Sequence, residues 1–233
     1  MTNSPETQVF DGAGAAAAAP FLSAKSGVPV YWRMKRIMDT SLAVLILVAL
    51  APLMLVLWLR CRNDGGPGLY GHVRIGRHGR AFRCLKFRTM VMDADAVLAC
   101  HLAENSAART EWLATRKLTA DPRITAAGRI LRASSLDELP QLFNVLRGEM
   151  SLVGPRPVVQ AELDTFYRPR DAAAYLSVRP GLTGLWQVSG RSDVDYARRV
   201  GLDTAYVRNA SLTLDAQILL RTVKVVLLRQ GAR

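Results

Sequence analysis

An uncharged apolar stretch from Thr40 to Leu59, TSLAVLILVALAPLMLVLWL, restricts the fold of this chain more than any other feature. At about 1.5 Å of rise per residue, a helix of this length just crosses the ~30 Å hydrocarbon core of a bilayer. Hydropathy alone therefore predicts a transmembrane helix.

Two further features favour a helix that enters and leaves the membrane on the same side. Basic residues flank both ends of the apolar stretch, and the positive-inside bias marks both flanks as cytoplasmic, which a single crossing cannot satisfy. Pro52 lies inside the stretch, where a missing N–H and a ring clash break or kink a helix. We therefore predict a re-entrant membrane helix within residues 33–62, broken at Pro52, with a spanning helix as the alternative.

The remaining residues divide into a leader and one globular domain. Residues 1–32 are poor in charge, contain an alanine tract and predict a flexible leader. Residues 63–233 are long enough for one sizeable domain, with a hairpin predicted at 69–90 and an amphipathic helix at 212–229. The expected fold is α/β, or α+β: a small helix-rich domain with a short sheet, seated on the membrane by the re-entrant helix and by interfacial amphipathic helices.

The net charge of +12 predicts an anionic partner, which is a nucleic acid, an acidic lipid or a phosphorylated substrate. The apolar stretch shifts this choice towards the membrane. The three cysteines include no C-x-x-C pair, which excludes a disulfide framework and a zinc site built from paired thiolates.

Two adjacent carboxylates, Asp137 and Glu138, lie in the segment SSLDELPQL. One interpretation is a capping box with Ser135, because acidic residues favour the start of a helix. The other is catalytic: one carboxylate attacks while its neighbour holds Mg²⁺, which prefers a few carboxylates together with phosphate oxygens. Spacing alone favours the first. If the regular helix starts at Pro140, both carboxylates lie at or just before its entry.

Cationic side chains offer two candidate anion sites. Arg156 lies between Pro155 and Pro157, and an arginine on so rigid a backbone is either a bidentate phosphate ligand or a solvated loop residue. Lys86 and Arg88 are two residues apart in KFR, so strand alternation places both on one face, which suits anion binding or a wet face over a core.

Several motifs in a fixed order resemble those of the bacterial sugar transferase family, the monotopic phosphoglycosyl transferases that act on polyprenyl phosphate. They are KFRTM, DPRITAAGRILR, SLDELPQLFNVLRGEMSLVGPRP, RPGLTGLWQVSGR and DTAYVRNASLTLD. The resemblance covers about residues 33–228 and is strongest to small enzymes that start exopolysaccharide synthesis, the rhizobial undecaprenyl-phosphate galactose phosphotransferases.

The resemblance implies transfer of a sugar 1-phosphate, with galactose favoured, from a UDP-sugar to undecaprenyl phosphate, with release of UMP. It implies that Asp137 is the nucleophile that forms a covalent phosphosugar intermediate, that Glu138 assists with Mg²⁺, and that Lys86 steadies the aspartate or the transferred phosphate. Substrate binding is expected at four residues: Arg88, Arg132, Arg156 and Asp203. The alternatives are the same reaction with UDP-glucose or a UDP-N-acetylated sugar, and a basic membrane-anchored binding module.

The resemblance also implies a location and partners. The family's re-entrant helix is broken near a Ser-Pro pair, and the corresponding Ala51–Pro52 lacks the hydroxyl that bonds a freed carbonyl. We expect the bacterial inner membrane, with the catalytic domain facing the cytoplasm. The expected partners are the UDP-sugar, undecaprenyl phosphate and downstream glycosyltransferases, with no nucleic acid; family members can also form homodimers.

Overall fold

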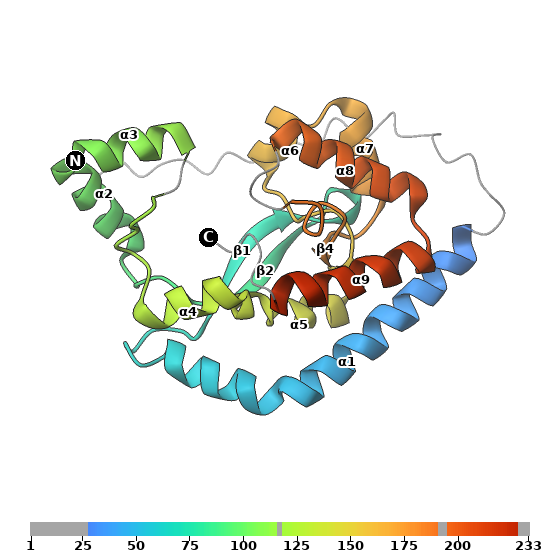
Figure 1. The fold of residues 1–233 in the computed structure, drawn as a ribbon, viewed down its shortest axis with the longest axis horizontal. Coiled ribbons are helices and arrows are strands. Elements are labelled where there is room, and N and C mark those ends of the chain that lie inside the picture. Colours follow the sequence, from blue (N-terminus) through green and yellow to red (C-terminus); the bar gives the residue numbers. More distant parts are fainter. Residues whose placement is uncertain (1–27, 116–117, 191–194, 228–233) are drawn as a thin grey trace, which may run out of the picture.

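The computed structural model describes residues 28–115, 118–190 and 195–227, which form one long helix and a domain of shorter helices around two small sheets (Figure 1). The long helix, α1 (Val28–Cys61), begins before the predicted boundary at residue 33, so residues 28–32 are helical rather than part of a leader. The rest of the predicted leader, residues 1–27, lies outside the described residues. The helix-rich α/β character predicted for the chain is confirmed.

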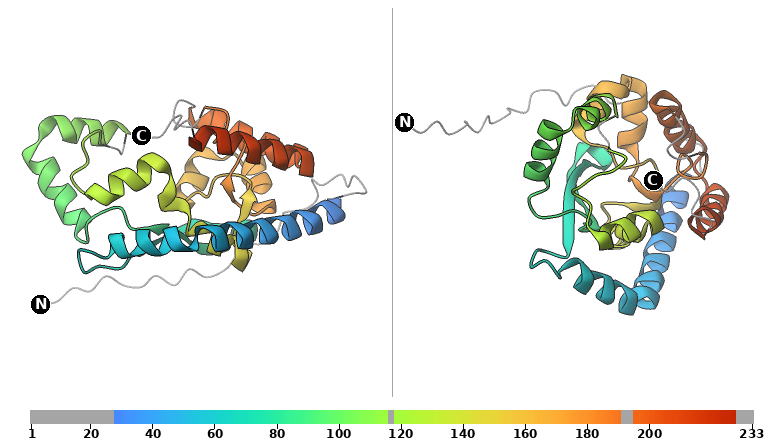
Figure 2. Two further views of the ribbon diagram at one scale, coloured as in Figure 1. Left: turned by 60° about the horizontal axis from the view of Figure 1, so that its bottom comes forward. Right: turned by 60° about the vertical axis from the view of Figure 1, so that its left-hand side comes forward.

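Helix α1 runs along one side of the domain over its whole length (Figure 2, left). Its first half is joined to the domain by the buried Lys35 and Asp39, and its second half packs Met54 and Cys61 beside Phe87. Only 6% of its most apolar window is buried, although the helix is long and apolar enough to cross a membrane. The outward face is therefore a large exposed apolar surface, as expected of a membrane anchor.

The predicted break at Pro52 is wrong in one respect, because α1 remains helical from end to end with Pro52 inside it. The helix instead bends in the half that contains Pro52 (Figures 1 and 2). A proline removes one hydrogen-bond donor and crowds the preceding turn, which is enough to kink a helix without ending it. Both halves of α1 contact the same domain. The re-entrant arrangement of α1 in a membrane stays a prediction.

The predicted hairpin is confirmed. Strands β1 (Leu69–Ile75) and β2 (Ala81–Phe87) pair antiparallel, with Leu69 opposite Phe87 and Ile75 opposite Ala81. The short 3₁₀ turn η1 (Arg77–Gly79) joins them where the glycines predicted a turn. A second sheet pairs β3 (Ser151–Val153) parallel to β4 (Gly181–Thr183), so the described residues form two two-stranded sheets rather than one short sheet.

The other helices surround these strands: α2 (Ala94–Glu104), α3 (Ser106–Thr115), α4 (Ala126–Ser134), η2 (Leu136–Glu138), α5 (Gln141–Arg147), α6 (Gln160–Phe166), α7 (Pro169–Ser177), α8 (Tyr196–Asn209) and α9 (Leu212–Leu227). The largest core lies where α1, α5, β3, α8 and α9 meet, and its fully buried side chains include Leu142, Val145, Val153, Tyr206 and Ile218. This core holds α5 and β3 against α1, so the segments just before α5 and just after β3 have fixed positions relative to the anchor.

Candidate active site

The two carboxylates lie on η2, the single 3₁₀ turn between α4 and α5. Helix α4 ends at Ser135, which adopts a left-handed conformation with φ of 56°, and α5 begins directly after Pro140. The side chain of Ser135 makes no capping hydrogen bond to η2, so the capping-box interpretation does not hold. Both Asp137 and Glu138 therefore precede the entry of α5, as the position of Pro140 predicted.

Lys86, on β2, bridges the two carboxylates. Its Nζ donates to Glu138 Oε1 at 2.7 Å and lies 3.5 Å from Asp137 Oδ2. Asp137 is only 8% exposed, and burial raises the pKa of its carboxyl, while the positive charge of Lys86 opposes that rise. The ammonium thus favours the ionised carboxylate in a place that disfavours charge, and an ionised, poorly solvated carboxylate is a competent nucleophile.

Arg132 lies on the last turn of α4, near enough to Asp137 to help lower the pKa of that carboxyl. Its Nε donates to Thr89 Oγ1 at 2.9 Å, which ties α4 to the segment that follows β2. Gly128 allows α4 to approach the backbone of Thr89 closely, because a Cβ at residue 128 would lie 2.1 Å from the carbonyl oxygen of Thr89. The structure therefore brings four predicted residues together: Lys86, Arg132, Asp137 and Glu138.

Arg156 follows β3 in the Pro-Arg-Pro loop, and its Cζ lies 5.3 Å from the centre of the Trp186 ring. Cys84 lies on the inward face of β2, two residues before Lys86. Burial raises the pKa of its thiol to about 11, and the positive charges of Lys86 and Arg156 oppose that rise. Arg156 is also close enough to help lower the pKa of Asp203. The charge of Arg156 therefore acts on both the thiol of Cys84 and the carboxyl of Asp203.

Asp203 is on α8, 2% exposed, and burial raises the pKa of its carboxyl to about 7 although Arg199 and Arg156 oppose the rise. Its neighbours include Arg199, Arg156 and Tyr167. The substrate-binding role of Asp203 stays a prediction.

Arg88 lies apart from the carboxylate pair. Strand β2 ends at Phe87, so the alternation that would align Arg88 with Lys86 does not continue. The guanidinium of Arg88 forms an ion pair with Asp64 and donates to the carbonyl oxygens of Cys61 at 2.6 Å and Pro67 at 2.7 Å. The side chain thereby fastens the end of α1 to the hairpin. Because the guanidinium of Arg88 already binds these groups of the protein, we do not place Arg88 in the substrate site.

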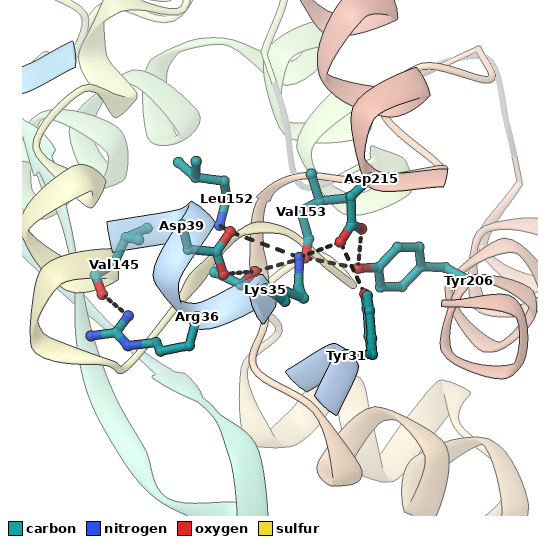
Figure 3. A network of polar contacts seen from close by, with 10 residues as sticks. Tyr31, Lys35, Arg36, Asp39, Val145, Leu152, Val153, Tyr206 and Asp215 are labelled. Carbon is teal, nitrogen blue, oxygen red and sulfur yellow. Dashed lines mark hydrogen bonds and ion pairs between the residues drawn. The ribbon is translucent and has the colours of Figure 1, made fainter. Parts of the chain in front are cut away.

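A buried polar network that sequence analysis missed joins α1 to the opposite end of the chain (Figure 3). Asp215, on α9, accepts from Lys35 Nζ at 3.0 Å, from Tyr31 Oη at 2.9 Å and from Tyr206 Oη at 2.7 Å. Its side chain is fully buried, so these three donors take the place of water around the carboxylate. The available signal was the single acidic residue in the largely apolar segment 212–229.

The same network reaches β3 through Asp39. Its carboxylate accepts from Ser151 Oγ at 2.7 Å and from the backbone N–H of Leu152 at 3.2 Å, and lies 3.8 Å from Lys35 Nζ. A lysine and an aspartate four residues apart, next to an apolar stretch, were the signal in the sequence. The network fixes α1 against β3, the strand that leads into the Arg156 loop.

Comparisons with known proteins agree with this geometry. The model of the bacterial sugar transferase family matches residues 30–229. An undecaprenyl-phosphate galactose phosphotransferase of Salmonella typhimurium is 55% identical over 199 residues, which are 85% of this chain and 41% of that protein. The exopolysaccharide production protein ExoY of Sinorhizobium fredii is 51% identical over 222 residues, 93% of this chain and 96% of that protein.

A UDP-glucose:undecaprenyl-phosphate glucose-1-phosphate transferase of Caulobacter vibrioides is 41% identical over 206 residues, 85% of this chain and 71% of that protein. The chain therefore spans less than half of the Salmonella relative and nearly all of ExoY. Because the family model covers most of the chain, and relatives of similar length share about half of its residues, this chain belongs to the bacterial sugar transferase family.

Proposed function

We propose that this protein transfers a sugar 1-phosphate from a UDP-sugar to undecaprenyl phosphate, releases UMP, and so starts the synthesis of an exopolysaccharide. The observation that carries the proposal is the buried carboxylate of Asp137, bridged by Lys86 to Glu138. The names of the relatives, which refer to undecaprenyl phosphate or to exopolysaccharide production, support the substrates.

In the first step an oxygen of Asp137 attacks the phosphorus that carries the sugar. The bond from that phosphorus to the bridging oxygen breaks, and UMP leaves with the electron pair. The product on the enzyme is an acyl phosphate, a phosphosugar joined to Asp137. Arg132, which binds Thr89, and Arg156, which lies over Trp186, are suited to neutralise the phosphates, because guanidinium groups bind phosphate oxygens in a bidentate way.

In the second step a phosphate oxygen of undecaprenyl phosphate attacks the same phosphorus. The bond to Asp137 breaks, the carboxylate is regenerated, and the lipid leaves as a diphosphate that carries the sugar. Two steps keep the two anionic substrates from having to meet directly, since each reacts with the enzyme in turn. Lys86 remains beside the carboxylate in both steps and favours its ionised form.

Mg²⁺ fits the donor set at this site. The ion prefers oxygen ligands and uses one or two carboxylates together with substrate phosphates, and Glu138 beside Asp137 supplies that set. Within the described ranges no group of three or more His, Cys, Asp or Glu forms a protein-only cage. Glu138 is the residue that would hold the ion, and a bound ion would neutralise charge on the departing nucleotide.

The position of α1 suits a lipid acceptor. The helix carries its exposed apolar face along one side of the domain, and β2 and α4, which contribute Lys86 and Arg132, pack against it. A domain seated on a membrane in this way keeps its active site near the headgroups, where the phosphate of a polyprenyl lipid lies. The basic flanks of α1 favour the cytoplasmic face of the inner membrane.

Galactose is the sugar we propose, because the relative with 55% identity is named for galactose and the one with 41% identity for glucose. UDP-glucose and UDP-N-acetylated sugars are the alternatives that the experiment must include.

The test is release of UMP from each UDP-sugar by the purified protein in detergent, with undecaprenyl phosphate and Mg²⁺. We expect lipid-dependent release that is fastest with UDP-galactose and absent in Asp137→Asn, together with a phosphosugar adduct on the wild type in intact-protein mass spectra. Asp164→Asn is the matched control, because Asp164 is an exposed aspartate on α6. Full activity in Asp137→Asn would exclude the covalent mechanism. A folded wild type with no activity on any UDP-sugar would favour the binding module.

A further inference from the structure

Beyond Arg156, the structure gathers buried polar side chains whose hydrogen-bonding capacity is not met. The atoms without a partner are Tyr167 Oη, Trp186 Nε1, Gln187 Oε1, Tyr196 Oη, Arg199 Nε and Nη2, and both carboxylate oxygens of Asp203. Buried polar atoms in folded proteins nearly always have a partner, so such a concentration in one place calls for an explanation.

These side chains form one cluster. The guanidinium carbon of Arg199 lies 4.9 Å from the centre of the Trp186 ring and 4.7 Å from that of Tyr196. The Tyr167 and Tyr196 ring centres are 6.5 Å apart, and Arg156 approaches Trp186 at 5.3 Å. The cluster therefore extends to Arg156.

Arg199 and Asp203 are the charged members, four residues apart on α8. They are 8% and 2% exposed, yet the structure gives them neither a mutual hydrogen bond nor an ion pair within 4.0 Å. Two opposite charges buried at this spacing would ordinarily pair on the helix face. The backbone N–H of Arg156 and the hydroxyl of Tyr167 lie near the Asp203 carboxyl. Neither makes a hydrogen bond of good geometry to it, so its two oxygens and the Nε and Nη2 of Arg199 can still bind another group.

The mixture of donors and acceptors restricts what that group is. A phosphate offers only acceptors, so it would leave the acceptor atoms of Gln187 and Asp203 without a donor. A hydroxyl both donates and accepts, so neighbouring hydroxyls of one ring satisfy a carboxylate and a guanidinium at once. The aromatic rings beside Arg199 supply an apolar wall, which suits a sugar ring better than an ion.

We propose that Arg199 and Asp203 bind hydroxyl groups of a sugar ring in the UDP-sugar donor, with Tyr167 and Tyr196 completing the contacts. This inference rests on the proposed function and adds to it the residues that recognise the donor. Arg156, which lies over the Trp186 ring of this cluster, then binds the adjoining phosphates. A donor carries two hydroxylated rings, the hexose and the ribose, and both have this chemistry.

The test compares Arg199→Lys and Asp203→Asn with two exposed controls, Arg198→Lys on the same helix and Asp164→Asn on α6. Kinetics with the full chain in detergent should show a donor KM raised about tenfold or more in the two cluster variants, because each loses a hydrogen bond to a charged group. The KM for undecaprenyl phosphate should not change, and both controls should match the wild type.

Calorimetric titration in an Asp137→Asn background measures binding without turnover. If the cluster variants weaken binding of UDP-galactose and UMP equally, the ring is the ribose, which both ligands contain. If only UDP-galactose binding weakens, the ring is the hexose. Wild-type affinity for both ligands in cluster variants with unchanged melting temperatures would overturn the inference and make the cluster structural.

If either charge variant fails to fold, Tyr167→Phe and Tyr196→Phe provide the same test, because each removes one hydroxyl and keeps the ring. Unchanged donor affinity in both would likewise overturn the inference. The proposed function is judged separately from wild-type UMP release. Active wild type with unaffected cluster variants refutes only the donor contacts, whereas a wild type that neither reacts with nor binds any UDP-sugar refutes both.

Discussion

Replacing Lys35 by methionine tests the buried network that holds α1 to the domain. Lys35 Nζ lies 3.0 Å from Asp215 Oδ2 and 3.8 Å from Asp39 Oδ1, and the three side chains are at most 4% exposed. Methionine keeps most of the volume and the helix propensity of lysine, so the change removes one charge with little change in packing. It leaves two buried carboxylates without their shared cation.

The expected loss follows from what each carboxylate retains. Removing one partner of a buried ion pair typically costs about 3–5 kcal/mol. Here Asp215 keeps the hydroxyl donors of Tyr31 and Tyr206, and Asp39 keeps that of Ser151. We therefore expect about 3 kcal/mol, at the lower end of that range. For a domain of this size that corresponds to a melting temperature lower by roughly 6–12 °C.

The assay is thermal and denaturant unfolding in detergent, followed by tryptophan fluorescence. Arg33→Met is the matched control, because Arg33 is an exposed cation two residues earlier on α1, and its loss should stay within about 0.5 kcal/mol. Combining Lys35→Met with Asp215→Asn should recover part of the loss, since the double variant no longer buries an uncompensated charge there. A loss below about 1 kcal/mol in Lys35→Met, or one equal to the control, would refute this reasoning.

Two further predictions concern Arg88 and Asp203. Arg88→Met should lower the free energy of unfolding by about 3 kcal/mol, because Asp64 and the carbonyls of Cys61 and Pro67 lose a charged donor. A denaturant midpoint equal to that of the wild type would show that these contacts of Arg88 contribute nothing to stability. Asp203 has a pKa of about 7 in the folded protein, above the ~3.9 of an unfolded chain, so the folded state binds the proton more tightly. The free energy of unfolding should therefore fall as the pH rises from about 4 to about 7, by up to about 4 kcal/mol. Unfolding of the wild type and of Asp203→Asn at pH 5 and pH 8 isolates this group, and equal pH dependence in the two proteins would contradict the raised pKa.

Local patterns predicted the elements whose cause is local. Glycines around residues 76–79 and the apolar runs beside them predicted the hairpin, and Pro140 predicted where α5 begins. The apolar stretch predicted the long helix, although Pro52 did not interrupt it. Spacing alone favoured a capping box, which the structure does not form. The family resemblance of the motifs instead predicted that Lys86 acts beside the two carboxylates.

Contacts between distant segments decided the rest. Alternation along KFR placed Arg88 beside Lys86, but the strand ends at Phe87 and Arg88 turns to Asp64 instead. A strand pattern gives the direction of a side chain only while the strand continues, and its end depends on what packs against it.

A long apolar helix, a strongly basic chain, a hairpin and two adjacent carboxylates can all be predicted from local sequence, because each depends on residues close together in the chain. Which charges are buried, and what they face, depends on the folded protein. Lys35 meets Asp215 across 180 positions, and Arg199 is enclosed by Trp186 and Tyr196 beside Asp203. Burial and pairing depend on the complete packing of the chain, and these set the pKa values and the free hydrogen-bonding groups from which the chemistry of the site was inferred.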